Sequence, residues 1–410
     1  MTSRLASRGG SARVINPRAT LKTRSPSLTG ASIPSFRGTI DEAVSAYQPA
    51  LPTYVTRPDI LAEDVSEFVQ LFPGDVVYAV KCNPEKHVLQ VMAKNGVQNY
   101  DVASLEEIRA VKRVAPKAKL FYMHPVKAPE AIREAYFEHG VRAFVLDSKD
   151  EMYKIMRETD LASDLELFVR LALPKNKKAL IDFSSKFGAL PTETAELLQL
   201  CRSVSTKLGL CLHVGTQTTD PAVYKRAIKV AATVIKASGV KVDILDVGGG
   251  FPVEYPDQPV PPLAVFIDAI KDAVRVNKLS HMHLMCEPGR KLVARSGSLV
   301  VRVEGRKGNM LYLNDGTYGG LFDAGAQLKG RFPVKRVGGS DKFGEEAAQV
   351  GFRFAGPTCD SIDMMDGPFY LPEDMKAGDW IEIGQTGAYS IAMRSNFNGF
   401  GAAERLLLLK

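Results

Sequence analysis

The chain has 410 residues, 45% of them hydrophobic and 24% charged, which is enough apolar material for a large soluble enzyme with more than one domain. No apolar run approaches the roughly 18 residues of a membrane span, so no membrane segment is expected. The formal net charge is +7, but seven of the 53 basic residues lie in residues 1–40, which contain no acid. The other 46 basic residues balance the 46 acidic ones, so the body of the chain does not indicate a nucleic-acid partner.

Residues 1–40 form the only biased segment of the chain. They are rich in Arg and Ser, contain no acidic residue and lack a secretory apolar core. This composition predicts a disordered basic arm, and an organelle transit peptide is the alternative. We therefore expect a cytoplasmic protein, with organelle import through the arm as the other possibility.

The cysteines indicate whether disulfides or metal sites are expected. The number of cysteines is odd and no CxxC pair occurs, so neither a disulfide framework nor a zinc or other metal site is predicted. A reducing compartment is the expectation. The five residues are Cys82, Cys201, Cys211, Cys286 and Cys359.

Eight apolar runs, each ending in a polar or glycine tip, predict buried strands. They cover residues 76–81, 99–103, 120–124, 143–147, 165–171, 210–214, 244–250 and 284–287. Helical periodicity separates them, for example at residues 85–95, 105–114, 130–139, 192–208, 222–238 and 263–276. Eight strand and helix units over roughly 215 residues predict an α/β fold with a closed (β/α)8 TIM-type barrel. An open doubly wound sheet is the alternative.

The strand tips of such a barrel surround one mouth. A lysine at the end of a buried strand, as Lys81 is, must reach water or be held at a site. In a closed barrel it would share a cavity with the polar tips of the other strands. These tips carry Lys81, Asp101, Arg170, His213, Gly248, Gly249, Gly250 and Glu287.

After about residue 295 the pattern changes to clusters of β-forming residues between Gly and Pro turns. Residues 298–303, 309–314 and 379–383 predict strands of a separate antiparallel domain. We expect residues 41–60 and 296–410 to form this β-sandwich or β-barrel domain, and residues 61–295 to form the (β/α)8 barrel.

Two late tips predict a phosphate site. Gly248, Gly249 and Gly250 remove every Cβ that would keep a phosphate from backbone N–H groups. The next strand closes with Glu287-Pro288-Gly289-Arg290, which adds a second close backbone approach and a guanidinium. Late strands of this fold commonly hold phosphates.

Motifs in order along residues 40–405 carry a family resemblance. They are Tyr78-Ala79-Val80-Lys81, Asp101-Val102-Ala103-Ser104, Ser185-Lys186-Phe187-Gly188, His213-Val214-Gly215, Asp246-Val247-Gly248-Gly249-Gly250-Phe251-Pro252, Glu287-Pro288-Gly289-Arg290, Asn314-Asp315-Gly316-Thr317-Tyr318-Gly319, Gly356-Pro357-Thr358-Cys359-Asp360-Ser361, Gly387-Ala388-Tyr389 and Phe397-Asn398-Gly399-Phe400. With these motifs the chain resembles the ornithine/lysine decarboxylase family, pyridoxal-phosphate enzymes with an alanine-racemase-like barrel.

The resemblance implies how pyridoxal 5'-phosphate would be held. Lys81 would form a Schiff base with its aldehyde, and His213 would lie flat against its ring. Asp101 is similar to the family's aspartate near the imine, and Arg170 to an arginine just outside the direct cofactor contacts. The phosphate group would meet the glycine tips and a few polar residues: Gly248, Gly249, Gly250, Gly289, Arg290, Tyr389 and Thr216, the last where the family more often has serine.

Glu287 is the residue that indicates which reaction the resemblance implies. A carboxylate beside the pyridine nitrogen keeps that nitrogen protonated, so the ring accepts an electron pair when carbon dioxide leaves Cα. Racemases of this barrel family have an arginine there. The resemblance therefore favours decarboxylation.

The second domain would complete the site. Cys359 resembles the family cysteine that returns a proton to Cα, and Asp360 the acid that binds the distal ammonium of the substrate. Both come from the partner subunit in this family, which implies a homodimer with active sites at the interface. Tyr318 and Phe397 are implied substrate contacts. Asp323 is also implied, although it follows Tyr318 by five residues in a shortened segment.

The resemblance implies a decarboxylase of a basic L-amino acid, either ornithine to putrescine or lysine to cadaverine, in polyamine biosynthesis. A diaminopimelate-type decarboxylase is an alternative, but would have a Cys-Glu-Ser type motif at residues 359–361. A catalytically inactive paralogue that regulates polyamine synthesis is the other alternative. It would be expected to lose Lys81 or Cys359, and both are present.

Overall fold

We describe a computed structural model of the chain. It defines residues 33–174, 186–338 and 348–410, and residues 33–410 belong to one compact unit. No helix in these three ranges is both long and apolar enough to cross a membrane. All five cysteines are free thiols, and Cys359 alone among them is exposed.

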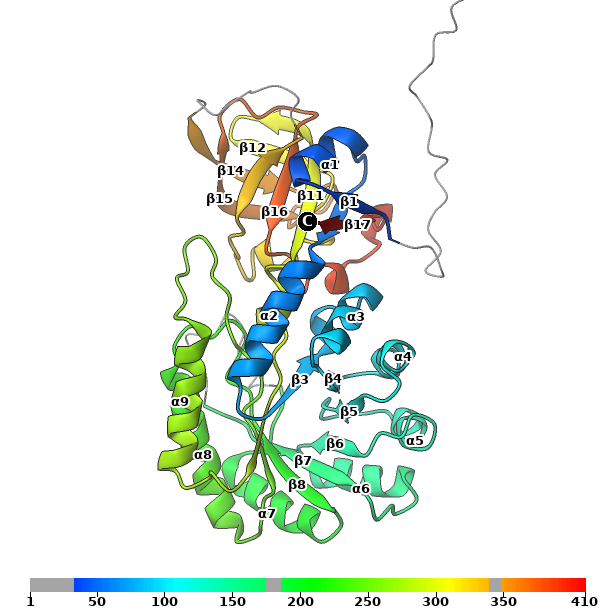
Figure 1. Ribbon diagram of the computed structural model, residues 1–410, viewed down its shortest axis with the longest axis vertical. Helices are drawn as coiled ribbons and strands as arrows, with labels where there is room; N and C mark the ends of the chain where they lie inside the picture. The colour runs from blue at the N-terminus through cyan, green and yellow to red at the C-terminus, as the bar shows by residue number, and fades with distance from the viewer. Residues whose placement is uncertain (1–32, 175–185, 339–347) are drawn as a thin grey trace, which may run out of the picture. The chain divides into compact units, whose positions relative to one another are not determined.

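Eight parallel strands close into a barrel (Figure 1). They are β3 (Asp75–Ala79), β4 (Asn99–Val102), β5 (Lys119–Tyr122), β6 (Ala143–Leu146), β7 (Glu166–Arg170), β8 (Lys207–Cys211), β9 (Ile244–Asp246) and β10 (His283–Cys286). Strand β10 pairs with β9 on one side and with β3 on the other, which closes the ring. The predicted eight strands and their closure are confirmed, and the open sheet is excluded.

Side chains fill the barrel interior. Val77, Phe121, Val145, Phe168 and Met285 belong to one buried cluster contributed by separate strands. The rings of Phe121 and Phe168 meet edge to face, with centroids 5.8 Å apart. Burying each such side chain stabilises the fold by about 1.5–3 kcal/mol. The barrel is therefore a packed core, and chemistry is confined to its ends.

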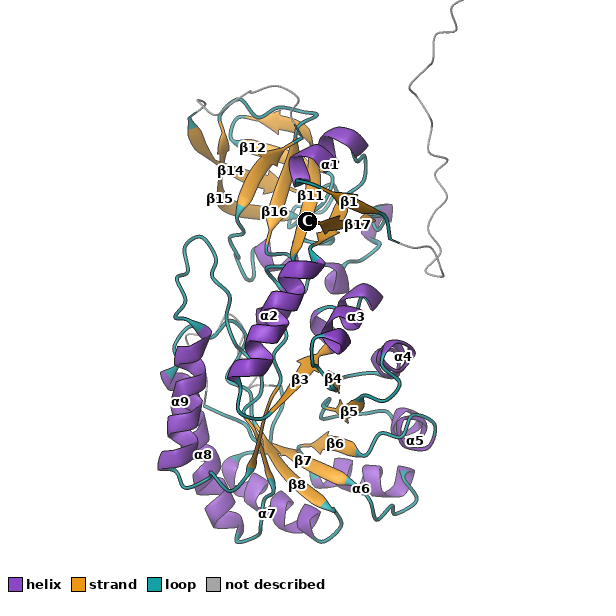
Figure 2. Cartoon of the chain, in the orientation of Figure 1, coloured by secondary structure: helices purple, strands orange, loops and turns teal. Residues whose placement is uncertain are grey.

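Helices surround the strands (Figure 2). They are α2 (Pro58–Leu71), α3 (Lys86–Lys94), α4 (Leu105–Val114), α5 (Pro129–Phe137), α6 (Lys149–Glu158), α7 (Pro191–Arg202), α8 (Ala222–Ser238), α9 (Leu263–Val276) and the short α10 (Arg290–Val293). Helix α4 shows why they form: Ser104 caps it by accepting a hydrogen bond from Glu107 N–H, and Ile108 and Val111 bury its apolar face. The helix predicted at residues 192–208 ends at Arg202, because β8 already begins at Lys207.

The second domain contains α1 (Ile40–Tyr47) and a nine-stranded sheet. Its strands are β1 (Ser35–Arg37), β2 (Thr53–Thr56), β11 (Gly297–Lys307), β12 (Met310–Leu313), β13 (Val334–Val337), β14 (Gln349–Ala355), β15 (Met364–Pro372), β16 (Trp380–Gly384) and β17 (Glu404–Leu409). Most pairs are antiparallel, as expected. Three are parallel, namely β1 with β17, β17 with β2, and β12 with β14, so the sheet is mixed.

The N-terminal boundaries differ from those predicted. Residues 1–32 lie outside the described residues, but the predicted arm does not extend to residue 40, because Ser35–Arg37 pairs with the last strand, β17. Within the segment 41–60, α1, β2 and the loop between them join the β domain, where Pro49 and Ala50 accept hydrogen bonds from Trp380 and Asn314. Helix α2 begins at Pro58 and packs against α3, α9 and α10 of the barrel. A proline at the first helical position favours this start.

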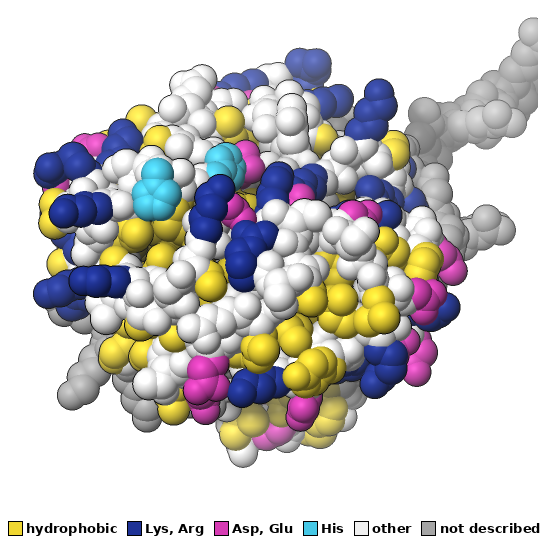
Figure 3. Space-filling model, turned by 90° about the horizontal axis from the view of Figure 1, so that it is seen from below, with side chains coloured by type: hydrophobic (Ala, Val, Ile, Leu, Met, Phe, Trp, Pro, Cys, Tyr) yellow, Lys and Arg dark blue, Asp and Glu magenta, His cyan; other side chains and the backbone are white. Residues whose placement is uncertain are grey.

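Charges of both signs mix on the surface. Acidic side chains lie among the Lys and Arg side chains on the face seen from below (Figure 3). Close ion pairs include Lys119 with Glu166 and Arg202 with Asp243, each with a shortest N–O distance of 2.6 Å. The first pair is exposed and contributes less than about 1 kcal/mol.

Backbone contacts join the β domain to the first strand tip of the barrel. Tyr389 N–H donates to the carbonyl of Cys82 at 2.9 Å, and the Asn83 side-chain amide donates to the carbonyl of Gly387 at 2.9 Å. A Cβ at Gly387 would lie 1.9 Å from the Val293 carbonyl oxygen, so only glycine allows this approach. The loop at residues 386–389 is thereby held beside Lys81.

Candidate active site

Lys81 lies at the mouth of the barrel, in the 3-10 turn η1 (Val80–Cys82) that follows β3. The strand ends at Ala79, two residues earlier than predicted. Lys81 Nζ donates to Asp101 Oδ2 at 2.9 Å; the lysine side chain is 46% exposed and that of Asp101 is 2% exposed. The amine is therefore accessible, and a buried carboxylate holds its orientation.

The charge state of Lys81 reflects two opposing effects. Loss of solvent lowers the pKa of an amine, but the Asp101 carboxylate and other nearby groups outweigh this effect and raise the pKa of Lys81. The free amine is thus held as an ammonium ion beside Asp101.

Glu287 follows β10 and is buried. Its backbone N–H donates to the carbonyl of Gly248 at 2.9 Å, which joins the tips of β9 and β10. Burial, and next the neighbouring Asp246, raise the pKa of Glu287 well above its ordinary value. Asp246 was not among the predicted site residues, although it opens the glycine motif and is completely buried.

His213 follows β8, and its Nδ1 accepts a hydrogen bond from Gly215 N–H at 3.0 Å. Burial, together with the positive charges of Arg170 and Lys81, lowers the pKa of His213 well below its ordinary value, so the imidazole is neutral. Arg170 ends β7 and is half-buried, with Cys211, Glu287 and Asp246 in its electrostatic surroundings. The tips of β7 to β10 therefore meet at one place, as predicted.

The three glycines admit no side chain. A Cβ at Gly248 would lie 2.0 Å from the Leu212 carbonyl oxygen. At Gly249 it would lie 2.6 Å from the Glu287 carbonyl oxygen and 3.0 Å from His213 Nε2, and at Gly250 it would lie 2.3 Å from the Gly215 carbonyl oxygen. Gly248 and Gly250 have φ angles of +69° and +98°, which disfavour other residues. Thr216 is buried next to this turn.

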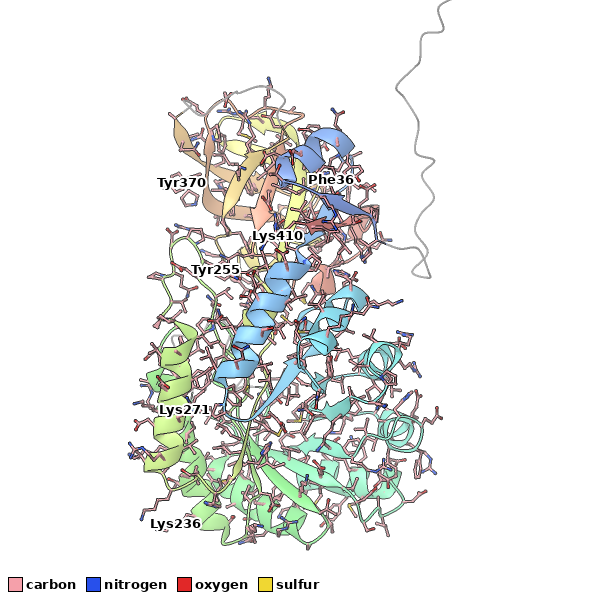
Figure 4. The ribbon with its side chains drawn as sticks, in the orientation of Figure 1. Phe36, Lys236, Tyr255, Lys271, Tyr370 and Lys410 are labelled. Atoms are coloured by element: carbon pink, nitrogen blue, oxygen red, sulfur yellow. The ribbon has the colours of Figure 1, made fainter. Side chains whose placement is uncertain are left out.

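Arg290 brings a buried cation to the same end of the barrel. It donates from Nη1 to Tyr255 Oη at 2.9 Å and from Nη2 to Asp323 Oδ2 at 2.8 Å, and its Nε has no acceptor among the residues that the structure describes. The guanidinium lies over the Tyr389 ring, 5.1 Å from its centroid. Tyr255, labelled in Figure 4, comes from the long segment between β9 and α9 and also packs against Phe332 of the β domain.

Asp323 lies on the Lys81 side of the site. It is in the 3-10 turn η2 (Phe322–Ala324) and pairs with Arg290. Its predicted contact with substrate stays a prediction.

The remaining predicted residues form a second group on the β domain. Tyr318 Oη donates to Asp360 Oδ2 at 2.6 Å, and the Tyr318 and Phe397 rings lie 4.7 Å apart. Cys359 is held by Asn398, which was not predicted: its Oδ1 accepts from both Cys359 N–H and Cys359 Sγ–H at 3.1 Å. Tyr318 and Phe397 line one small pocket together with Thr358 and Phe400.

The two groups are separate within one chain. In the described ranges, no hydrogen bond, ion pair or ring contact joins Tyr318, Cys359, Asp360 or Phe397 to Lys81 or Glu287. Of the Ser185 to Gly188 motif, the structure describes only residues 186–188.

The first group fits a phosphorylated pyridine aldehyde. Lys81 supplies an accessible amine. Glu287 supplies a buried carboxyl whose Oε1 receives no hydrogen bond within the described part of the chain. Gly248 to Gly250 and the uncommitted Nε of Arg290 suit a phosphate.

Comparison with known proteins identifies the family. Residues 59–294 match the family model described as pyridoxal-dependent decarboxylase, pyridoxal binding domain, which covers more than half of the chain. The chain belongs to the pyridoxal-dependent decarboxylase family. Its cofactor is pyridoxal phosphate, and the enzyme is a carboxy-lyase, as the motifs predicted.

Similar proteins include members with and without decarboxylase names. Ornithine decarboxylase of Schizosaccharomyces pombe is 32% identical over 344 residues, which cover 79% of this decarboxylase and 75% of that protein. Antizyme inhibitor 2 of Xenopus laevis is 33% identical over 350 residues, covering 79% and 73%. The crystal structure of lysine/ornithine decarboxylase from Vibrio vulnificus, complexed with putrescine, superposes with a TM-score of 0.75 at 29% identity, covering 90% of this chain and 97% of that one.

Proposed function

We propose that this decarboxylase acts on a basic L-amino acid, with ornithine or lysine preferred, and releases putrescine or cadaverine for polyamine synthesis. The observation that carries the proposal is the Asp360 carboxylate, oriented by Tyr318 Oη at 2.6 Å with the Phe397 ring alongside. A carboxylate beside aromatic rings suits an ammonium group at the end of an aliphatic chain. The names of the ornithine and lysine/ornithine decarboxylases support the same substrate class.

The residues of the first group have distinct tasks in this proposal. Lys81 would hold the cofactor covalently, and Asp101 orients the lysine. Glu287 would meet the ring nitrogen, and Arg290 with the glycine turn would bind the phosphate. The bound cofactor accepts the electron pair left when the Cα–carboxylate bond breaks. Neutral His213 supports the ring face without adding charge.

Cys359 is the proposed proton donor to Cα. Its thiol donates to Asn398 Oδ1 at 3.1 Å, which fixes the direction of the S–H bond before substrate arrives. The thiol is exposed, so it is available to a reacting group outside its own chain.

We propose that two copies of the chain complete each active site. The Cys359 group lies apart from the Lys81 group within one chain, and several large apolar side chains near it are exposed. Ile362 is 63% exposed, Phe400 45%, and Phe397 and Met393 42% each. An isologous dimer through this surface would cover the apolar side chains and bring Cys359 to the partner's Lys81.

Product analysis tests the substrate. The enzyme is supplied in turn with ornithine, lysine, arginine and diaminopimelate, and the amines are quantified; release of putrescine or cadaverine at the highest kcat/KM is expected. Predominant turnover of diaminopimelate would instead establish the alternative decarboxylase. No turnover of any amino acid by cofactor-loaded protein would overturn the proposal in favour of a regulator, the class suggested by the antizyme inhibitor relative.

A further inference from the structure

Asp246 ends β9 and is the most deeply buried acid of the site, with no measurable exposure. Its two oxygens have different surroundings. Oδ1 accepts from Gly248 N–H at 2.8 Å, which holds the first glycine of the turn. Oδ2 has no donor from any described part of the chain. An unpaired buried carboxylate oxygen is costly, so its environment requires an explanation.

The neighbouring strand supplies that explanation. Asp246 lies opposite Met285 in the parallel register of β9 and β10, and Val247 N–H donates to the Met285 carbonyl at 2.9 Å. Glu287 comes two residues later, just after β10, is also buried, and feels the charge of Asp246. Glu287 Oε1 likewise lacks a donor in the described ranges. The two acids therefore face each other.

Two facing carboxyl groups can hydrogen-bond to each other only when one of them carries a proton. Burial raises the pKa of Asp246 to about 6 even though the Gly248 N–H bond opposes the shift. Burial and the charge of Asp246 raise the pKa of Glu287. Like charges in contact cannot both ionise in a buried site.

Other charged or titratable groups surround the pair from every neighbouring element. Arg170 and Lys81 favour the ionised forms, whereas the carboxylate of Asp101 disfavours them. The thiols of Cys211 and Cys286 and the imidazole of His213 are nearby but are held neutral by burial. Arg170 and Lys81 reduce the repulsion between the two acids. In the described ranges, neither cation forms an ion pair with Asp246 Oδ2 or Glu287 Oε1.

We propose that Asp246 is a positioning residue for the cofactor and that it shares one proton with Glu287. When the ring nitrogen of the cofactor binds beside Glu287, this proton leaves the two acids. A ring nitrogen that arrives unprotonated receives this proton; one that arrives protonated displaces the proton to solvent. In both cases one N–H donates to the Glu287 carboxylate, and Asp246 remains ionised behind it. The inference rests on the assigned cofactor and is independent of which amino acid is decarboxylated.

Asp246→Asn separates proton sharing from shape. The amide is isosteric with the carboxylate; its oxygen can still accept from Gly248 N–H, and its NH2 can donate to Glu287. Glu287 is then ionised before the cofactor binds. Glu287→Gln replaces the other carboxyl of the pair by an amide, so no proton can be shared between two carboxyl groups. Asp101→Asn is the matched control, because Asp101 is a buried acid of the same site that pairs with Lys81.

Infrared difference spectroscopy on the full chain freed of cofactor tests the proposal at neutral pH. A protonated carboxylic acid has a carbonyl stretch that carboxylates lack. Wild type is expected to show one such band that both Asp246→Asn and Glu287→Gln lose and Asp101→Asn keeps. Adding pyridoxal phosphate, without any amino acid, should remove the band from wild type.

Absence of the band in wild type, or its survival in either pair variant, would overturn the shared proton. A band that persists after the cofactor binds would overturn its transfer. Because no amino acid is present, a wrong substrate assignment leaves all of these results unchanged. If Asp246→Asn does not fold, as judged by circular dichroism, Glu287→Gln reports on the same band.

Discussion

Arg290 and Asp323 form a buried ion pair, with Arg290 Nη2 donating to Asp323 Oδ2 at 2.8 Å. Since Arg290 is the proposed phosphate-binding cation, Asp323 is placed to hold that cation in position. Asp323→Ala should leave that cation unpaired and loosen the site. We expect the dissociation constant for pyridoxal phosphate to rise by at least about tenfold, equivalent to about 1.4 kcal/mol, in a fluorescence titration.

Asp360→Ala is the matched control for that change. It removes the other aspartate that was predicted to bind substrate, so KM for the amino acid should rise by about tenfold or more while cofactor affinity stays at the wild-type value. If the two variants exchanged these effects, the assignment of Asp323 to the cofactor side would be wrong.

Two glycines with similar backbone angles should respond differently to alanine. Gly239 has φ +65° with open space around it, whereas Gly248 has φ +69° and its Cβ would lie 2.0 Å from the Leu212 carbonyl oxygen. Gly239→Ala should cost about 1–2 kcal/mol in the free energy of unfolding, measured in urea. Gly248→Ala should cost clearly more and weaken cofactor binding; equal costs would contradict the close packing.

Asp246 predicts a pH dependence of stability. A carboxyl whose pKa is higher in the folded chain, here about 6, than in the unfolded chain, about 3.9, binds more protons when folded. Its contribution to stability is therefore greatest below about pH 4 and is lost as pH rises to about 6. Denaturation of cofactor-free wild type and Asp246→Asn across this range should give a difference curve with that slope. A flat difference would refute the raised pKa.

Asn398 should control the Cys359 thiol. Asn398→Ala removes the acceptor of both Cys359 hydrogen bonds, so the thiol should react faster with iodoacetamide and kcat should fall, with cofactor affinity preserved. Asn396→Ala tests whether loop loosening alone has this effect, because Asn396 Oδ1 instead accepts from Gly401 N–H. Equal thiol reactivity in both variants would argue against a specific role for Asn398.

The proposed dimer predicts complementation. Lys81→Ala and Cys359→Ala subunits should each be inactive alone. When equal amounts of the two variants exchange subunits randomly, about half of the dimers are heterodimers, and one of the two sites in each heterodimer has both residues intact. The mixture should therefore recover up to about one quarter of the activity of the same amount of wild type. Absence of any recovery in heterodimers verified by mass spectrometry would show that each site lies within one chain.

Much of the barrel could be predicted from the sequence because its signals are local. Apolar runs and the periodicity of the intervening helices indicate strands and helices within windows of ten or so residues. Closure then follows from eight similar units. The same logic placed Lys81, Asp101, His213 and Glu287 at one mouth. Helix α2 was missed because residues 41–60 were assigned as one β segment, although Pro58 marks a helix start.

Spacing by itself determined the strand tips, and the resemblance of the motifs on them to a known family implied the cofactor and the carboxy-lyase reaction. Only the tertiary structure decided which partners those tips have. Asp246 meets Glu287 because of the register of β9 against β10, and Asp323 meets Arg290 because a turn of the β domain folds back onto the barrel. Such contacts join residues distant in the chain, and their energies depend on burial and mutual charge, which no local sequence window contains.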